Sequence, residues 1–196
     1  MVNKPSRIIT NLSGHFLLAT EEMAGTYFED VLVYVCTHED EMTLGLVVNQ
    51  EMIELSFEQI MDSLKDEVDL KRSDVVHWPK IMAGGPVDIE RGLVLHSNDY
   101  KSPHTIELTD DIFLTSTADI VAAIAKGTGP EYYNLCMGYS GWSPLQLEDE
   151  IANDSWMVVP GSAEILFKTP VDERYGAAAE SMGLNFTNFS GFTGEA

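Results

Sequence analysis

The amino-acid sequence predicts a single α+β domain with a mixed or antiparallel sheet surrounded by helices. Its 196 residues are 44% apolar, which suffices for a globular core. Strand and helix patterns follow one another without the strict alternation of a doubly wound sheet, and hairpin-length connections join some of the strands. We assign residues 1–183 to this domain. Residues 184–196, polar and glycine-rich apart from three phenylalanines, are predicted to form a loosely ordered tail.

The N-terminal strands are predicted from apolar runs. The run at 15–19 predicts the first strand, and the runs at 31–37 and 44–49, separated by a short polar segment, predict a hairpin. Neither hairpin run alternates apolar and polar residues. We therefore expect both faces of the hairpin to be covered.

The remaining elements follow from helical periodicity and further apolar runs. A helix is predicted at 56–64, where Ser56 and Gln59 have the spacing of a capping box. Further helices are predicted at 117–126, 144–153 and 172–182, the second of them with Ser143 as N-cap and Pro144 as its first residue. Further strands are predicted at 80–83, 91–96, 105–108, 112–115, 133–138 and 156–159.

Charge is the most unusual bulk property of the chain. There are 32 acidic and 11 basic side chains, a formal net charge of -21. Nonspecific affinity for nucleic acids comes from cations that contact phosphates, so this composition disfavours DNA or RNA as a partner. An anionic membrane surface is disfavoured for the same reason. A basic protein partner and simple solubility both fit the charge.

The sequence predicts a cytoplasmic protein. No apolar run approaches the roughly 20 residues that cross a bilayer, and the first ten residues are too polar for the core of a signal peptide. Cys36 and Cys136 lie in separate apolar runs without a C-x-x-C spacing. We expect two buried free thiols rather than a disulfide or a metal site.

The segment from Gly138 to Glu148 carries the strongest local pattern. It predicts a strand, a tight glycine turn and a helix, which is the setting of a hydrolase nucleophile. However, Trp142 stands where the G-x-S-x-G pattern needs its second glycine after Ser140, and all histidines lie at or before His104. A serine hydrolase is therefore disfavoured.

Glu148 falls near the centre of the apolar side of its predicted helix. A carboxylate that faces a core must be paired, hydrogen-bonded or neutral. Arg91 shares a strand face with apolar residues, and we predict an Arg91–Glu148 ion pair. A ligand-binding role for Glu148, or its simple exposure to water, are the alternatives.

The other polar motifs do not indicate a particular reaction. Gly84-Gly85-Pro86 predicts a structural turn with close backbone approach, because it lacks the residues of a phosphate-binding loop. The acidic segment 38–41 lacks a second histidine for a metal site. His96 is the histidine that we expect in a cleft, but one histidine identifies no reaction. We predict no catalytic set, no metal site and no cofactor.

Several short motifs follow one another in a fixed order along nearly the whole chain. They are His15-Phe-Leu-Leu-Ala19, Leu44-Gly-Leu-Val-Val-Asn49, Gly84-Gly-Pro86, Arg91-Gly-Leu-Val-Leu-His96, Gly138-Tyr-Ser-Gly-Trp142, Gln146-Leu-Glu148, Trp156, Ile165-Leu-Phe167, Arg174-Tyr175 and Gly183. This ordered set resembles the YqgE/AlgH family of small bacterial proteins. The resemblance implies an α+β domain with a small closed or bifurcated sheet surrounded by helices, and no established activity. The regulator label attached to some members implies a genetic association rather than a DNA-binding motif.

The chain also departs from the family pattern. Gln50 and Glu51 replace the usual lysine and proline after Asn49, which weakens any anion-binding role implied for that loop. Position 140 is commonly alanine in the family, so the resemblance implies no nucleophile there.

Three functions remain, and the sequence ranks a non-enzymatic binding or regulatory protein first. An enzyme of unassigned class using a cleft near Arg91, His96 and Glu148 is the alternative, and a transcriptional regulator that binds DNA directly ranks last. The partner is an unidentified protein or small ligand, and the oligomeric state is open. The predicted binding residues are Asn49, Gly84, Gly85, Arg91, His96, Tyr139, Gly141, Trp142, Gln146 and Glu148.

Overall fold

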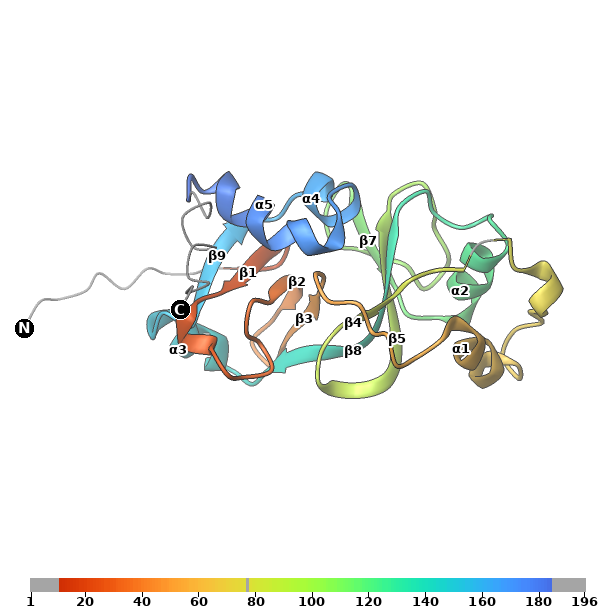
Figure 1. The fold of residues 1–196 in the computed structure, drawn as a ribbon, viewed down its shortest axis with the longest axis horizontal. Helices are drawn as coiled ribbons and strands as arrows, with labels where there is room; N and C mark the ends of the chain where they lie inside the picture. The colour runs from red at the N-terminus through yellow and green to blue at the C-terminus, as the bar shows by residue number, and fades with distance from the viewer. Residues whose placement is uncertain (1–10, 77, 185–196) are drawn as a thin grey trace, which may run out of the picture.

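The apolar runs of the sequence form the strands of one curled sheet. The computed structural model describes residues 11–76 and 78–184. Its strands are β1 (His15–Ala19), β2 (Leu32–His38), β3 (Thr43–Val47), β4 (Ile81–Ala83), β5 (Val87–Ser97), β6 (Ile106–Glu107), β7 (Ile112–Thr115), β8 (Tyr133–Trp142) and β9 (Trp156–Pro160). They pair in the order β6-β7-β5-β8-β3-β2-β1-β9, with β4 beside β8 (Figure 1).

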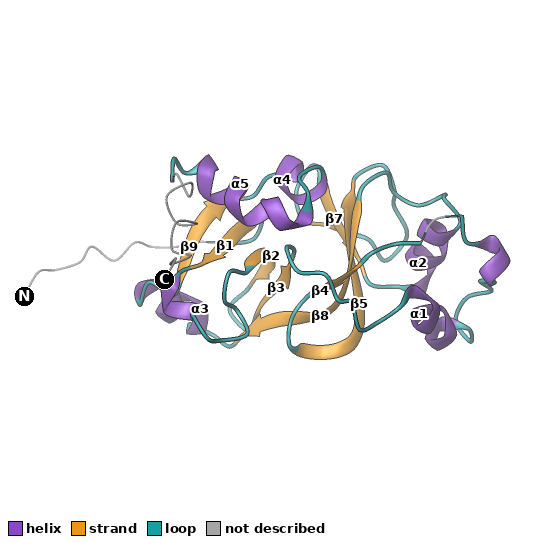
Figure 2. Ribbon diagram, in the orientation of Figure 1, coloured by secondary structure: helices purple, strands orange, loops and turns teal. Residues whose placement is uncertain are grey.

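Strand β8 joins the two halves of this sheet. Its first half pairs antiparallel with β5 and parallel with β4, while Ser140–Trp142 pairs antiparallel with β3. Gly138, at a φ of 68°, lies between the two halves and lets the strand turn from one set of partners to the other. The result is a mixed, mostly antiparallel sheet that curls into a half-barrel (Figure 2).

The predicted glycine turn packs directly against that bend. A Cβ on Gly85 would lie 2.1 Å from the carbonyl carbon of Tyr139, and one on Gly84 would lie 2.4 Å from the carbonyl oxygen of Gly138. The main chain of Gly84 also donates to Met137 and accepts from Val47. The expected close backbone approach is confirmed.

The helices cover different parts of the sheet. They are α1 (Phe57–Leu64), α2 (Ala118–Ala125), α3 (Gln146–Ala152), α4 (Ala163–Phe167) and α5 (Arg174–Ser181), with short 3-10 turns η1 (Glu21–Met23), η2 (Arg72–Asp74) and η3 (Val171–Glu173). Helices α4 and α5 pack on the face of β1 and β2 that carries Phe16 and Leu18, and α3 packs on the opposite face with Leu17. Helices α1 and α2 cover the part of the sheet around Val94 and Leu135. Both faces of the predicted hairpin are therefore buried, as expected.

The sequence-based prediction misplaced the end of one strand and the start of one helix, and it missed another helix. Strand β8 does not end in a turn at Gly138 but continues to Trp142, because β3 supplies hydrogen bonds beyond the glycine. Helix α3 begins at Gln146 after Leu145, whose φ is 64°, so neither Ser143 nor Pro144 has the predicted position. Helix α4 was not predicted, since its five residues are too few for a periodic pattern.

The expectation of two buried free thiols is confirmed. Cys36 and Cys136 are both buried and free, and burial raises the pKa of each thiol. The described part of the chain has no helix of the length and apolarity needed to cross a membrane. Of the predicted tail, only Leu184 is described; residues 185–196 lie outside the described range.

Candidate functional site

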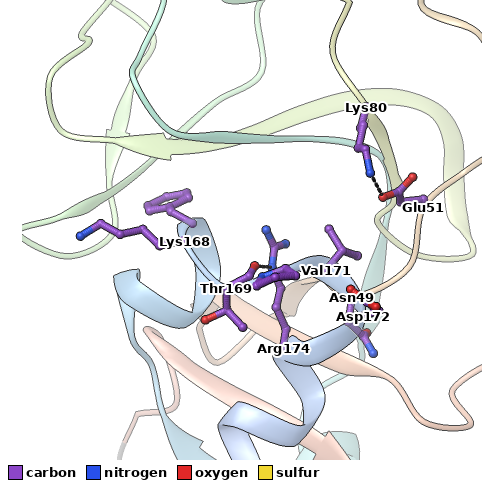
Figure 3. Close-up of a pocket in the computed structure, with 10 residues that line it drawn as sticks. Asn49, Glu51, Lys80, Lys168, Thr169, Val171, Asp172 and Arg174 are labelled. Carbon is purple, nitrogen blue, oxygen red and sulfur yellow. Dashed lines mark hydrogen bonds and ion pairs between the residues drawn. The ribbon is translucent and has the colours of Figure 1, made fainter.

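A cleft opens beside the start of α5. It has a volume of about 680 Å³ and lies between the loop that joins α4 to α5 and the segments that carry Asn49, Glu51 and Lys80 (Figure 3). We call it the α5 cleft. Its lining residues are Asn49, Glu51, Lys80, Phe167, Lys168, Thr169, Pro170, Val171, Asp172 and Arg174.

The local sequence explains why an arginine faces the interior here. Ser162 caps α4 through the backbone N–H of Ile165, and the chain then turns through Pro170 into η3. Helix α5 follows without a break, and its buried positions are Arg174, Ala178 and Ala179. Residues four apart share a helix face, so the guanidinium extends from the same face as the small alanines that pack on the sheet.

Arg174 is 5% exposed and anchored by neutral oxygen atoms. Its Nη1 donates to the Val48 carbonyl at 2.6 Å and to Asn134 Oδ1 at 2.8 Å, and its Nε donates to the Thr169 carbonyl at 3.1 Å. Its Nη2 has no hydrogen-bond partner among the described residues. Three of the five N–H donors therefore hold the side chain in place, and two remain for the cleft.

The charge of Arg174 is not neutralised by a carboxylate. No carboxylate of the described residues lies within 4.0 Å of the guanidinium nitrogens. Burial lowers the pKa of Arg174, and the more distant charge of Glu51 acts in the opposite direction. A buried cation without a paired carboxylate is unusual in proteins.

The two lysines that line the cleft are already paired. Lys80 binds the Glu51 carboxylate at 2.5 Å, and Lys168 binds Glu164 at 2.9 Å, one helical turn earlier. Asp172 is exposed at the same cleft. Arg174 is therefore the cation of the described lining that lacks a carboxylate partner.

A second, smaller cleft of about 270 Å³ adjoins the first and shares Arg174 with it. We call it the aromatic cleft. The rings of Tyr132 and Phe167 stack there, with centroids 6.4 Å apart and planes at 28°, and Lys168 Nζ lies 5.9 Å from the centre of the Tyr132 ring. Its lining residues are Lys80, Met82, Glu131, Tyr132, Tyr133, Asn134, Phe167, Val171 and Arg174.

Of the predicted binding residues, Asn49 lies at the α5 cleft. Its Oδ1 accepts from the Leu32 N–H and its Nδ2 donates to the Asp30 carbonyl, both at 2.8 Å. The side chain therefore ties the end of β3 to the start of β2. Gly84 and Gly85 serve the backbone contact with β8 and do not line either cleft.

The predicted Arg91–Glu148 ion pair is wrong. Glu148 Oε1 instead accepts from His38 Nε2 at 3.0 Å, while His38 Nδ1 accepts from the Leu12 N–H at 3.0 Å. Arg91 is exposed and lies over the Tyr139 ring, 5.9 Å from its centre. The sequence correctly showed that Glu148 needs a partner, but strand and helix periodicity cannot show which residue the fold places opposite it.

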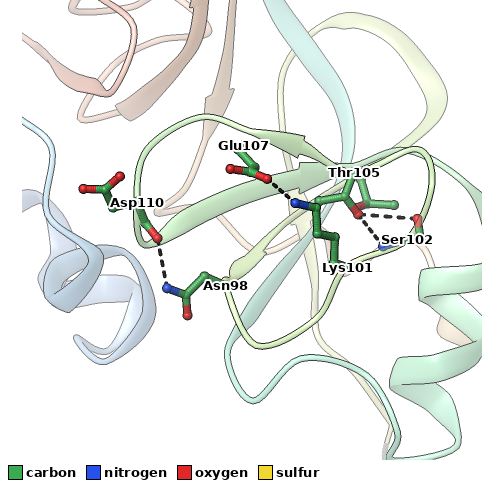
Figure 4. Close-up of polar contacts among 7 residues, drawn as sticks. Asn98, Lys101, Ser102, Thr105, Glu107 and Asp110 are labelled. Carbon is green, nitrogen blue, oxygen red and sulfur yellow. Dashed lines mark hydrogen bonds and ion pairs between the residues drawn. The ribbon is translucent and has the colours of Figure 1, made fainter.

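His96 is buried rather than placed in a cleft. Its Nδ1 donates to the Ser97 carbonyl at 2.9 Å, and its Nε2 accepts from the Thr115 hydroxyl at 2.9 Å. Burial lowers the pKa of the imidazole. Thr115 in turn shares a 2.8 Å hydrogen bond with Thr105, which holds the main chain of Ser102 in the loop after β5 (Figure 4).

The remaining predicted residues form a structural cluster around Glu150. Trp142 Nε1 donates to Glu150 Oε2 and Gln146 Nε2 donates to Glu150 Oε1, at 2.8 and 2.9 Å. The indole of Trp156 donates to the same Oε2 at 2.8 Å. Gly141 is exposed in the same stretch of β8. The predicted set is therefore divided among several separate environments and does not converge on one site.

Sequence reasoning missed the residue at the centre of the cleft. A helical projection of 172–182 places Arg174 with Ala178 on the apolar side, and this signal could have identified it. The contributions of Lys80, Tyr132 and Phe167 depend on long-range packing and have no sequence signal. Among the described residues, no group of three or more His, Cys, Asp or Glu side chains is placed to hold a metal ion.

Comparison with known proteins places this fold and sequence among uncharacterised relatives. Residues 16–187 match the DUF179 family, described as AlgH-like. A UPF0301 protein of Nitrosospira multiformis is 38% identical over 188 residues, covering 95% of this chain and 98% of the relative. A UPF0301 protein of Rhizobium etli is 38% identical over 186 residues, covering 93% and 92%.

Two solved structures also resemble the structure of this chain. The solution structure of the AlgH protein from Pseudomonas aeruginosa matches with a TM-score of 0.78 at 34% identity and covers 100% of both chains. A crystal structure of a Corynebacterium diphtheriae protein matches with a TM-score of 0.66 at 14% identity over 95% of each chain, which shows the fold alone.

Proposed function

The chain belongs to the AlgH-like family, and we propose that it is a binding protein that holds a small organic anion in the α5 cleft. One observation carries the proposal: Arg174 is 5% exposed, lacks a carboxylate partner among the described residues and lines the cleft. In a chain of net charge -21, a buried cation without a counter-ion concentrates anion affinity at one place.

The geometry favours binding over the alternatives from the sequence. Arg91, His96 and Glu148, the residues of the predicted enzyme cleft, have separate partners: the Tyr139 ring, Thr115 and His38, respectively. Direct binding to DNA remains disfavoured by the net charge of -21. We therefore propose ligand binding, with any regulatory role following from it.

The test is a calorimetric titration at low salt with benzoate, phenyl phosphate and inorganic phosphate. We expect at least one of these anions to bind the wild-type chain with a dissociation constant below about 1 mM. The informative variant is Val171→Glu, since Val171 lines both clefts and a carboxylate there competes with the ligand for Arg174. The matched control is Ile89→Glu, at a side chain that is 61% exposed on β5.

Binding is expected to be lost in Val171→Glu and retained within about twofold in Ile89→Glu. Because Val171→Glu removes an apolar side chain from the core edge, NMR on the wild-type chain provides a second readout. There, the amide resonances of Thr169, Val171 and Arg174 should shift with ligand. If no anion binds, or if both variants lose binding equally, the proposal is wrong.

A further inference from the structure

Among the described residues, the clefts hold one buried cation without a paired carboxylate. Lys80 and Lys168 are paired with Glu51 and Glu164, which leaves Arg174. Asp172 is exposed at the α5 cleft, and Glu131 is exposed at the aromatic cleft. These two carboxylates are screened by solvent, whereas the buried Arg174 charge is screened less. Arg174 can therefore balance one negative charge on a ligand, and the exposed carboxylates disfavour a second.

The free donors of Arg174 restrict the geometry of the anion. Guanidinium binds carboxylate and phosphate most strongly through a fork formed by two of its nitrogens. Here Nε and Nη1 are occupied by Thr169, Val48 and Asn134, so only Nη2 is free among the described residues. One nitrogen with two N–H groups meets a larger share of the acceptor capacity of a carboxylate, which has two oxygens and one charge. It meets a smaller share for a phosphate monoester, which has three terminal oxygens and up to two charges.

The second cleft has an aromatic wall. The stacked rings of Tyr132 and Phe167 line it together with Met82, and it meets the polar cleft at Arg174. Aromatic side chains offer large apolar contact and favour offset stacking with a planar partner. A ligand whose acidic group reaches Arg174 can therefore extend its apolar part along Tyr132 and Phe167.

We infer that the α5 cleft and the aromatic cleft together select a monocarboxylic acid with a flat apolar body, in preference to a phosphorylated ligand. The inference rests on the proposed function, since it assumes that Arg174 is the anion anchor, and it adds the class of ligand. The acid's carboxylate accepts from Arg174 Nη2, and its ring or unsaturated body lies beside Tyr132.

The experiment compares probes that share one body and differ in the acidic group. Titrations of the full chain with 2-naphthoate, 2-naphthamide and 2-naphthyl phosphate measure the contribution of the acidic group to affinity. Acetate, which lacks the aromatic body, measures the contribution of that body. We expect 2-naphthoate to bind at least tenfold more tightly than the neutral amide and the phosphate. It should bind at least thirtyfold more tightly than acetate.

The outcomes separate this inference from the proposed function. If 2-naphthyl phosphate binds more tightly than 2-naphthoate, the cleft binds anions but the carboxylate inference is wrong. If acetate binds as tightly as 2-naphthoate, the flat apolar body adds no affinity and that part of the inference is wrong. If the amide equals the carboxylate, Arg174 does not recognise charge and both proposals fail.

A side-chain variant tests where the apolar body lies. Tyr132→Leu removes one ring of the stacked pair, while the hydrogen bonds of Tyr132 to Ser97 are made by its main chain and remain. We expect this variant to weaken 2-naphthoate binding at least fivefold. Tyr27→Leu, at a ring 46% exposed against Phe28, is the matched control and should change binding less than twofold. If Tyr132→Leu and Tyr27→Leu bound 2-naphthoate equally tightly, the apolar body of the ligand would not lie beside Tyr132.

Discussion

Ser140 lies fully buried on β8, and its hydroxyl has no hydrogen-bond partner among the described residues. A buried hydroxyl without a partner loses its hydration and gains nothing in return. We therefore expect Ser140→Ala to leave the free energy of unfolding unchanged or to raise it by up to about 1 kcal/mol. Urea denaturation measures the difference.

Thr115→Val is the matched comparison for Ser140→Ala. The Thr115 hydroxyl is equally buried but bonds both His96 and Thr105, so its removal should lower the free energy of unfolding by about 2 kcal/mol. A loss of similar size in Ser140→Ala would mean that Ser140 has a partner, such as a buried water.

The free energy of unfolding should depend on pH through the buried imidazole of His96. Burial lowers its pKa in the folded state, so the unfolded chain binds the proton more readily. Its contribution to stability is fully present above the unfolded value of about 6.5 and is lost as pH falls below it. NMR titration of the imidazole should show a midpoint below 6.5. A midpoint above 6.5 would contradict the buried, neutral assignment.

Two arginines illustrate what the sequence can show of individual residues. Arg91 opens an apolar strand and looked paired, but it lies over Tyr139 at the surface, because β5 bulges between Val87 and Gly92. Arg174 lies in an Ala-rich helix and is the residue that the fold buries. Periodicity shows which face of a helix or strand a residue occupies. It does not show which residue of a distant segment the fold brings against that face.

Among the elements, the turn at Gly84-Gly85 has the strictest requirement. Gly85 has a φ of 156°, and a Cβ there would overlap the Tyr139 main chain at 2.1 Å. Gly85→Ala should lower the free energy of unfolding by more than about 3 kcal/mol, because backbone on both sides would have to move. Thermal and urea denaturation followed by circular dichroism would measure this loss.

Gly176 provides the opposite case within α5. A Cβ there would meet nothing within 4 Å, and the helix loses backbone entropy at a glycine. Gly176→Ala should therefore raise the free energy of unfolding by about 0.5–1 kcal/mol, measured by the same denaturation experiment. If both glycine variants changed stability by the same amount, the packing of the 84–85 turn would not be the cause.

At the level of elements, periodicity predicted most strands and the capped helix α1. The apolar runs of the hairpin and the capping box of Ser56 and Gln59 are local signals, and the structure contains both. The continuation of β8 past Gly138 has no local signal, since glycines at both ends of Tyr139-Ser140 suggest a turn. Pairing with β3 overrides that preference.

The whole molecule combines a strongly acidic composition with a cleft that is lined, among the described residues, by the buried Arg174. The net charge was evident from the sequence and predicted against nucleic-acid partners, but it could not locate the site. The α5 cleft brings together side chains from the loop after β3, the start of β4, the end of α4 and the first turn of α5. Its position depends on the order in which the strands pair, which no motif specified.

Charge repulsion should make the stability of the whole chain depend on salt. With 32 acidic and 11 basic side chains, most carboxylates have no cation to pair with. Raising NaCl from about 20 to about 200 mM shortens the screening length from about 20 to about 7 Å. We expect the melting temperature to rise by about 3 °C or more, because the folded state suffers more self-repulsion than the unfolded chain.

A rise with salt has a second potential source, which is chloride bound near Arg174. The Val171→Glu variant separates screening from chloride binding. Its carboxylate would bind Arg174 Nη2 in place of chloride and leave the rest of the surface charge unchanged. If the rise comes from screening, it should persist in Val171→Glu. If it vanishes there, the salt effect is anion binding at the cleft. A fall in melting temperature with salt would show that surface ion pairs such as Lys101–Glu107 outweigh the repulsion.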